Sequence, residues 1–109
     1  MTFYNINELK TQQPVEGVEL RIITGAKMSM GFFRLQPGAA IPEHSHPHEQ
    51  MGTVLQGAIE LTIGDETQVV TQGAAYHVLS NQPHSAQCLD KPTHILEAFS
   101  PPREDLIPE

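Results

Sequence analysis

Cysteines and long apolar segments are scarce in this sequence. Among its 109 residues there is one cysteine, Cys88, so no disulfide can form within the chain. No apolar run approaches the roughly 20 residues that a membrane-spanning helix requires. The first ten residues also lack the charged-then-apolar order of a signal peptide. We therefore expect a cytoplasmic protein with no segment in a membrane.

Positive charge is also scarce. Lysine and arginine total 6 against 13 aspartates and glutamates, which gives a formal net charge of -7, and the few cations are scattered along the chain. Nucleic acids and anionic membranes are therefore poor partners. A small anionic substrate stays possible, but it needs a local source of positive charge to enter an acidic protein.

The dominant pattern in the sequence is the alternation of apolar and polar residues. Apolar residues alternate with polar ones in three segments: 18–22, 28–32 and 59–63. Glycine and proline turn signals separate such segments about every 8 to 12 residues, and no sustained helical stripe interrupts them. The pattern predicts an all-β fold, a sandwich or barrel, and the length predicts one domain over residues 1–109. We expect the methionines to fill its interior.

A histidine-rich segment lies between two such turns. If residues 44–50 are extended, His44, His46, His48 and Gln50 point to one face and Glu49 to the other. Because Pro47 can interrupt the alternation before His48, the preferred ligand set is His44, His46 and Gln50, with His48 in reserve. His84, after a second turn, is the natural fourth ligand. Taken singly, each histidine is more typical of an ordinary surface or hydrogen-bonded side chain than of a ligand; together they favour a metal site.

The spacing of these residues resembles the two cupin motifs. Residues 38–57 read Gly38, His44, His46, Gln50 and Gly57, with glutamine where the first motif usually has glutamate. Residues 73–88 resemble the second motif through Gly73 and His84, although Leu79, Asn81 and Cys88 depart from it. The resemblance implies a double-stranded β-helix, the jelly-roll barrel of cupins. It also implies one divalent transition-metal ion (Zn, Ni, Mn or Fe) among His44, His46, Gln50 and His84.

Glutamine in this ligand set has a consequence for charge. Three imidazoles and an amide are all neutral, so a divalent ion keeps its full +2 charge, whereas a glutamate would cancel one unit. Such an ion would supply the local positive charge that an anionic substrate needs.

A narrower resemblance covers most of the chain. The run from His44 to Gln50, together with residues 97–105, is similar to the KdgF family of small cupins from pectin and alginate breakdown. That similarity implies a small anionic sugar substrate and the linearisation of 4,5-unsaturated monouronates to 5-keto-4-deoxyuronates. The family's catalytic acid, aromatic and arginine fall on Glu97, Phe99 and Arg103. Glu97 stands where the family is expected to have aspartate, which moves the carboxylate by about one methylene.

The same three residues also have a plain structural interpretation. Residues 93–100 predict a strand with Ile95, Glu97 and Phe99 on one face, so Glu97 lies either at an exposed edge or in a pocket that raises its pKa. Phe99 is more typical of a core residue than of a substrate platform. Arg103 is typical of a surface cation, unless it bends over the barrel mouth to bind a substrate carboxylate. Apolar residues on both faces near Met51 to Leu55 predict a homodimer.

Two other functions fit the ligand set. An Fe(II)-dependent cupin oxygenase would also use three histidines, and a non-catalytic cupin module could bind a sugar or a metal. Iron content and oxygen consumption would distinguish the oxygenase.

Overall fold

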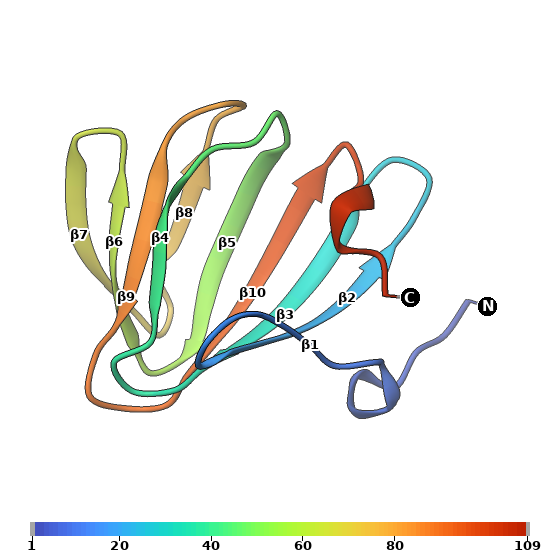
Figure 1. Cartoon of the computed structure of the whole chain (residues 1–109), viewed down its shortest axis with the longest axis horizontal. Helices are drawn as coiled ribbons and strands as arrows, with labels where there is room; N and C mark the ends of the chain where they lie inside the picture. The colour runs from blue at the N-terminus through green and yellow to red at the C-terminus, as the bar shows by residue number, and fades with distance from the viewer. Residues whose placement is uncertain (1, 109) are drawn as a thin grey trace.

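Two antiparallel β-sheets form the structure, a computed structural model in which residues 2–108 are described (Figure 1). One sheet has the strand order β1-β2-β3-β10-β5-β8 and the other the order β4-β9-β6-β7. The strand bounds are Gln12–Val15 (β1), Val18–Thr24 (β2), Ser29–Leu35 (β3), Ala40–His44 (β4), Glu49–Gln56 (β5), Ala58–Ile63 (β6), Glu66–Thr71 (β7), Ala75–Val78 (β8), His84–Cys88 (β9) and Thr93–Ser100 (β10). The expected single-domain, all-β barrel is confirmed.

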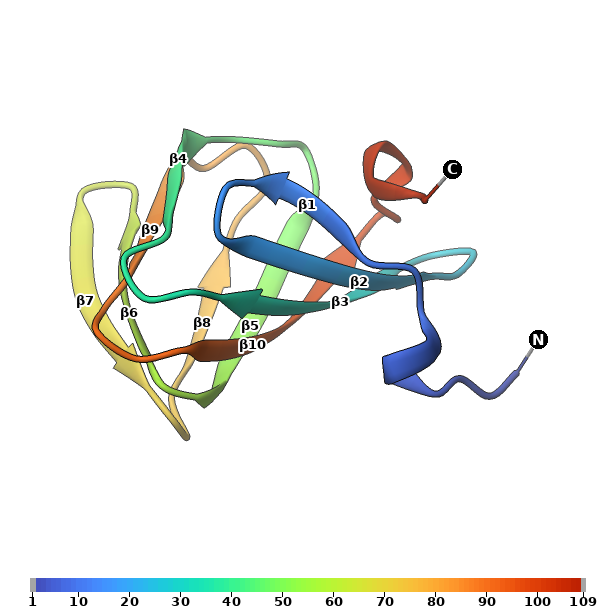
Figure 2. The ribbon, with the colours of Figure 1, turned by 60° about the horizontal axis from the view of Figure 1, so that its bottom comes forward.

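The hydrophobic core lies between the two sheets. Val18, Leu35 and Val54 come from the six-stranded sheet and Ile59 and Cys88 from the four-stranded one, and all five are at most 2% exposed. Turned by 60°, the ribbon shows the strands wrapping around this interior (Figure 2). Each strand contributes alternate residues to the core, which is why a period of two dominates the sequence.

Strand β10 lies in the middle of the six-stranded sheet, between β3 and β5. Its Ile95 and Phe99 are buried on the inner face, and Glu97 lies between them on the same face. The predicted last strand over residues 93–100 is therefore confirmed. Across the sheet, Glu97 pairs in register with Gly31 of β3 and with Gly52 of β5. No side chain on either neighbour competes with the carboxylate for space.

The expectation that residues 44–50 form one extended strand is wrong. Strand β4 ends at His44 and β5 begins at Glu49, so a four-residue connection that includes His46 and Pro47 lies between them. Gln50 nevertheless points inward and is 5% exposed, while Glu49 is exposed, as the alternation predicted. His46 is thus directed inward by the path of this connection and not by the alternation of side chains along a strand.

The expectation that methionines fill the barrel is also wrong for the three that lie in the described residues. Met28, Met30 and Met51 are 50%, 38% and 55% exposed. Met30 and Met51 lie on the outer face of the six-stranded sheet, where both pair in register with Ala98 of β10. The inner positions of β3 are taken instead by residues such as Ser29, Gly31 and Leu35.

Two turns of the cupin-like motifs have the backbone conformations that their residues favour. Asn81, in the position where the second motif has glycine, has φ 64°, a left-handed conformation that asparagine tolerates. Gly57 has φ 90°, and a Cβ there would collide with the Thr93 hydroxyl. That close approach joins the β5–β6 turn to the start of β10.

Short 3-10 turns flank the sheets at Ile6–Glu8 and Glu104–Leu106. The second turn lies beside β1, where the Gln12 amide donates a hydrogen bond to the Leu106 carbonyl at 2.8 Å. Neither turn, nor any other helix in residues 2–108, is long and apolar enough to cross a membrane.

Candidate metal centre

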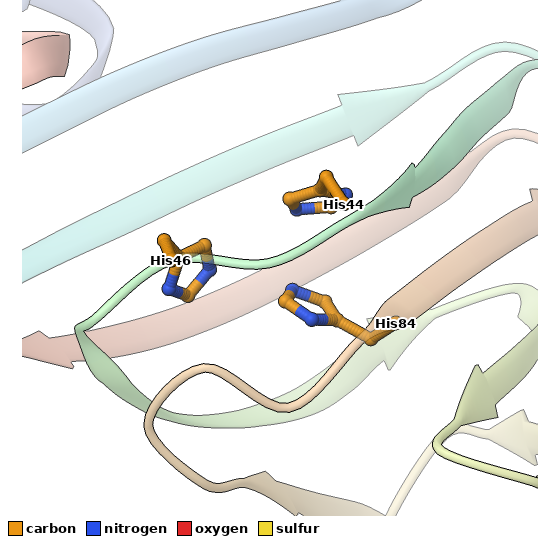
Figure 3. Close-up of side chains that lie close together, drawn as sticks. All are labelled: His44, His46 and His84. Carbon is orange, nitrogen blue, oxygen red and sulfur yellow. The ribbon is translucent and has the colours of Figure 1, made fainter.

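Three histidines converge at one end of the barrel (Figure 3). His44 ends β4, His84 begins β9, and the two are paired in register across these neighbouring strands. His46 comes from the connection before β5. One nitrogen from each of the three rings lies within 4.8 Å of the others. His46 and His84 are 9% and 5% exposed, and His44 is the most accessible of the three.

Backbone carbonyls give all three rings the same tautomer. The Nδ1 atoms of His44, His46 and His84 lie 2.8, 3.0 and 2.9 Å from the carbonyl oxygens of Pro42, His48 and Gln82. A carbonyl only accepts, so each Nδ1 carries the proton and each Nε2 keeps a free lone pair. The Nε2 of His84 is buried and has no hydrogen-bond partner among the described residues. A cation bound by the three Nε2 atoms would satisfy it.

The fourth expected ligand, Gln50, completes this arrangement. Its Oε1 lies 3.1 Å from Nε2 of His46, and its Nε2 donates to Oε2 of Glu97 at 2.6 Å. An amide oxygen and an unprotonated imidazole nitrogen are both acceptors, so their approach is unfavourable unless a positive ion binds both. The donor set therefore fits a divalent metal ion, and nitrogen and neutral oxygen ligands of this kind suit Zn, Ni, Mn or Fe.

Burial keeps the imidazoles of His46 and His84 uncharged. It lowers the pKa of His46 to about 4, with smaller contributions from the positive charge of Arg103 and from His84. The pKa of His84 is lowered as well, again mainly by burial. Neutral imidazole is the form that binds metal, so these two side chains need not lose a proton at neutral pH.

A cavity of about 330 Å³ opens beside the cluster. Most of its wall is apolar, formed by core side chains such as Leu20, Leu35 and Ile95. The polar side chains that line it include His44, Gln50, Tyr76, His84, Glu97 and Arg103. A small polar ligand would thus find ionic and hydrogen-bonding partners in the cavity wall.

Glu97 lies in this wall next to Gln50. Both of its hydrogen bonds fall on Oε2, one from the Gln50 amide and one from the Tyr76 hydroxyl, each at 2.6 Å. Burial raises the pKa of Glu97 above the usual range for a glutamate, and these two donors and Arg103 oppose that rise. Of the two sequence interpretations, an exposed edge or a pocket, the structure shows the pocket.

Sequence reasoning missed Tyr76. It lies on β8, and nothing in its local sequence distinguishes it from an ordinary strand aromatic. Its position becomes meaningful only through register, because Tyr76 is paired with Gly52, which is in turn paired with Glu97. Burial and the Glu97 carboxylate raise the pKa of the phenol, so Tyr76 keeps its proton and acts as a donor.

The two other expected site residues also line the cavity. Phe99 is 2% exposed, and the guanidinium carbon of Arg103 lies 4.7 Å from the centroid of its ring. Arg103 is not free, however: its Nε and Nη2 donate to the Asp105 carboxylate at 3.0 and 2.9 Å. This leaves Nη1 as the nitrogen that is not engaged by Asp105.

The reserve ligand His48 does not join the cluster of converging nitrogens. Its carbonyl accepts from His46, while its own ring contacts that of His46 edge-on, with centroids 5.3 Å apart. His77 is exposed and pairs with Glu49 at 2.6 Å on the outer face. Three histidines thus face one another, whereas His48 and His77 lie outside the cluster.

Comparison with known proteins agrees with this geometry. The cupin domain profile matches residues 31–99, more than half of the chain. The chain belongs to the cupin family. This cupin is 29% identical over 94 residues to the pectin degradation protein KdgF of Dickeya dadantii, covering 84% of this chain and 86% of that protein.

Two further comparisons place this cupin more finely. The structure of KdgF from Halomonas sp. superposes with a TM-score of 0.90 at 26% identity, covering 98% and 99% of the two chains. The transcriptional regulator PuuR of Escherichia coli is 32% identical over 75 residues, which cover 64% of this cupin and 40% of the regulator. The chain is thus similar over nearly its full length to KdgF and over part of its length to a regulator.

Metal analysis tests the ligand assignment. We expect about one divalent ion per chain in the purified protein, as in other histidine sites of this type. His46→Ala should lose most of it because a buried ligand is removed. His77→Ala, which removes an exposed histidine outside the cluster, should keep it. Equal and negligible metal in the wild type and His46→Ala would contradict the site.

Proposed function

We propose that this cupin is a metal-dependent enzyme that linearises 4,5-unsaturated monouronates to 5-keto-4-deoxyuronates. The observation that carries the proposal is the position of Glu97, a carboxylate in the cavity wall one hydrogen bond away from the candidate ligand Gln50. The similarity to the two KdgF proteins supports the substrate class. The cavity is of a size that suits a single sugar ring rather than a polymer.

His44, His46, Gln50 and His84 would hold the ion. When bound, a divalent ion supplies Lewis-acid stabilisation for negative charge that develops on the substrate's oxygens. The four side chains are uncharged in the ligating form, so none of the ion's charge is cancelled. They also leave the Glu97 carboxylate free for proton transfer.

Glu97 would move the proton. Ring opening requires that the C1 hydroxyl lose its proton, that the bond from C1 to the ring oxygen break, and that the resulting C5 enolate take up a proton at C4. Because Oε2 already accepts two hydrogen bonds, Oε1 is the oxygen that would take the C1 proton and return one to C4. Its raised pKa favours the first step, because a stronger base removes the C1 proton more readily.

Phe99 and Arg103 would hold the substrate. Phe99 forms an apolar wall against which one face of the ring can lie. Asp105 fixes the guanidinium of Arg103 over that wall and leaves Nη1 to donate to the substrate carboxylate. Only Nη1 of Arg103 would therefore bind the substrate carboxylate, because Nε and Nη2 already donate to Asp105.

Removal of the Glu97 proton acceptor tests the chemistry. Loss of the conjugated C=C absorbance of an unsaturated monouronate should be faster with wild-type protein than in buffer. Glu97→Gln should lose about 10²- to 10⁴-fold of the rate because the amide cannot accept the C1 proton, while it keeps the fold and the metal.

Glu49→Gln, which changes an exposed glutamate on the outer face, is the matched control and should behave as wild type. If the wild type gives no acceleration with galacturonate- or alginate-derived substrates, the enzyme assignment is refuted. If Glu97→Gln is as fast as the wild type, the proton moves through another group.

Exchange of the neutral ligand tests the charge argument. Gln50→Glu should retain the ion, since carboxylate is a good ligand, but lower the net charge of the site by one unit. It also replaces the amide that donates to Glu97 with a second carboxylate. Competitive inhibition by the saturated monouronate should therefore weaken, and unchanged affinity measured by inhibition or calorimetry would argue against this role for Gln50.

We also propose that the protein is a homodimer through the outer face of its six-stranded sheet. Met30, Ala98 and Met51 form an apolar row across β3, β10 and β5 at paired positions. Leu55, further along β5, is 50% exposed. Exposed apolar side chains that follow one another across three strands are typical of an interface rather than of a solvated face.

A charge in this row should separate the protomers. Light scattering at micromolar concentration should give the mass of a dimer for the wild type and of a monomer for Met51→Glu. Val69→Glu is the control, because Val69 is equally exposed, at 55%, but lies on β7 in the other sheet. A monomer mass for the wild type would refute the dimer.

A non-catalytic binding module is the second candidate, favoured by the partial match to the regulator PuuR. In that case the cavity would bind a small ligand without turning it over. Saturable binding of the monouronate by wild-type protein, with no acceleration of ring opening, would support this function over the enzyme.

A further inference from the structure

Tyr76 reaches Glu97 across an intervening strand. Strand β5 separates β8, which carries Tyr76, from β10, which carries Glu97, and Gly52 is the residue of β5 paired with both. The Tyr76 hydroxyl donates to Oε2 of Glu97 at 2.6 Å. To reach from β8 to β10, the phenol ring must lie directly above the backbone of β5.

Gly52 provides the space for this crossing. A Cβ at residue 52 would lie 2.5 Å from both the Cζ and the hydroxyl oxygen of Tyr76. Any other residue there would push the ring away from the carboxylate. The position of the Tyr76 ring thus explains why residue 52 is glycine. The geometry of the metal ligands alone explains neither residue.

The hydrogen bonds around Glu97 are unevenly distributed. The Gln50 amide and the Tyr76 hydroxyl both donate to Oε2, Gln50 from the neighbouring strand β5 and Tyr76 from β8 beyond it on the same side of β10. No hydrogen bond reaches Oε1 within the described residues, and Glu97 lines the cavity. With two donors on one oxygen, rotation of the carboxylate would break both bonds, so the group is held in one orientation.

We infer that Tyr76, in the space provided by Gly52, is a positioning residue that holds Glu97 with Oε1 directed to the substrate. The inference rests on the proposed function and deepens it, because it states which carboxylate oxygen exchanges the proton and what fixes it. Without the tyrosine hydroxyl, Gln50 alone would hold Oε2, and the carboxylate could rotate about that single bond.

Kinetics of Tyr76→Phe test the positioning role. The variant keeps the ring and loses only the hydroxyl, so kcat for ring opening should fall about 10- to 100-fold, as when orienting partners of a site are removed, with KM and metal content unchanged. Gly52→Ala should lower kcat in the same way by displacing the ring.

Matched controls accompany both variants. Thr53→Val removes a hydroxyl that also makes a 2.8 Å hydrogen bond but comes from outside the cavity lining. Gly25→Ala adds a methyl group in an exposed turn with ordinary contacts. Both should match the wild type. An unchanged kcat in Tyr76→Phe would overturn the inference, as would a rise in KM alone, which would mean that Tyr76 binds substrate instead.

A spectroscopic measurement tests the contact without relying on activity. The sequence has no tryptophan and two tyrosines, Tyr4 and Tyr76, so Tyr4→Phe leaves Tyr76 as the only source of tyrosine fluorescence. A carboxylate that accepts the phenol proton quenches this emission. In that background, Glu97→Gln should raise the emission and Glu49→Gln should not.

The two measurements separate the possible failures. If the wild type does not accelerate ring opening, the proposed function is refuted, and the fluorescence comparison still decides whether Tyr76 binds Glu97. Equal emission from the Tyr4→Phe protein with and without Glu97→Gln would overturn the contact and with it the inference, even if the enzyme is active.

Discussion

The amide of Gln50 joins the two halves of the site, and the arrangement of both depends on it. Its oxygen faces His46 and its nitrogen donates to Glu97. An amide can present an acceptor to a cation and a donor to a carboxylate at the same time, through two different atoms. A glutamate in its place would put a second negative charge against Glu97. In the proposed site, the neutral amide would therefore serve the carboxylate as well as the metal.

The sheet supports this arrangement by leaving space at the right positions. Both cross-strand neighbours of Glu97 are glycines, Gly31 and Gly52. At Gly31 the space that a Cβ would take is filled by Phe33, Leu20 and Phe99. Tyr76 uses the space above Gly52 to reach the same carboxylate. Together these residues account for a buried acid without an unpaired charge.

Much of the fold could be predicted from the sequence because strand alternation is a local property. The period of two located β2, β6 and β10 and placed Glu97 on the same face as Ile95 and Phe99, which the structure shows to be the inner face. Alternation alone does not say which face of a strand is buried. Met30 and Met51 point outward, and this becomes clear only from the pairing of β3 and β5 with β10.

The candidate site could also be predicted only in part from the sequence. Motif spacing brought His44, His46, Gln50 and His84 together, although the assumption of one continuous strand through residues 44–50 was wrong. The contact of Tyr76 with Glu97 spans 21 residues in sequence, and the pairing of Arg103 with Asp105 depends on the path of the chain after β10. The first contact is set by tertiary structure, which no local pattern records, whereas the second joins residues only two apart in the segment after β10.

The position of β10 has a consequence for how the protein forms during synthesis. Strands β3 and β5 flank β10, so until residues 93–100 have left the ribosome these two strands have open edges and the sheet lacks its centre. The histidine motif is made long before the strand that carries Glu97 and Phe99. The nascent chain thus carries the three histidines on an incomplete barrel whose exposed strand edges can pair with other chains. Insertion of one eight-residue strand closes both edges and completes the cavity wall.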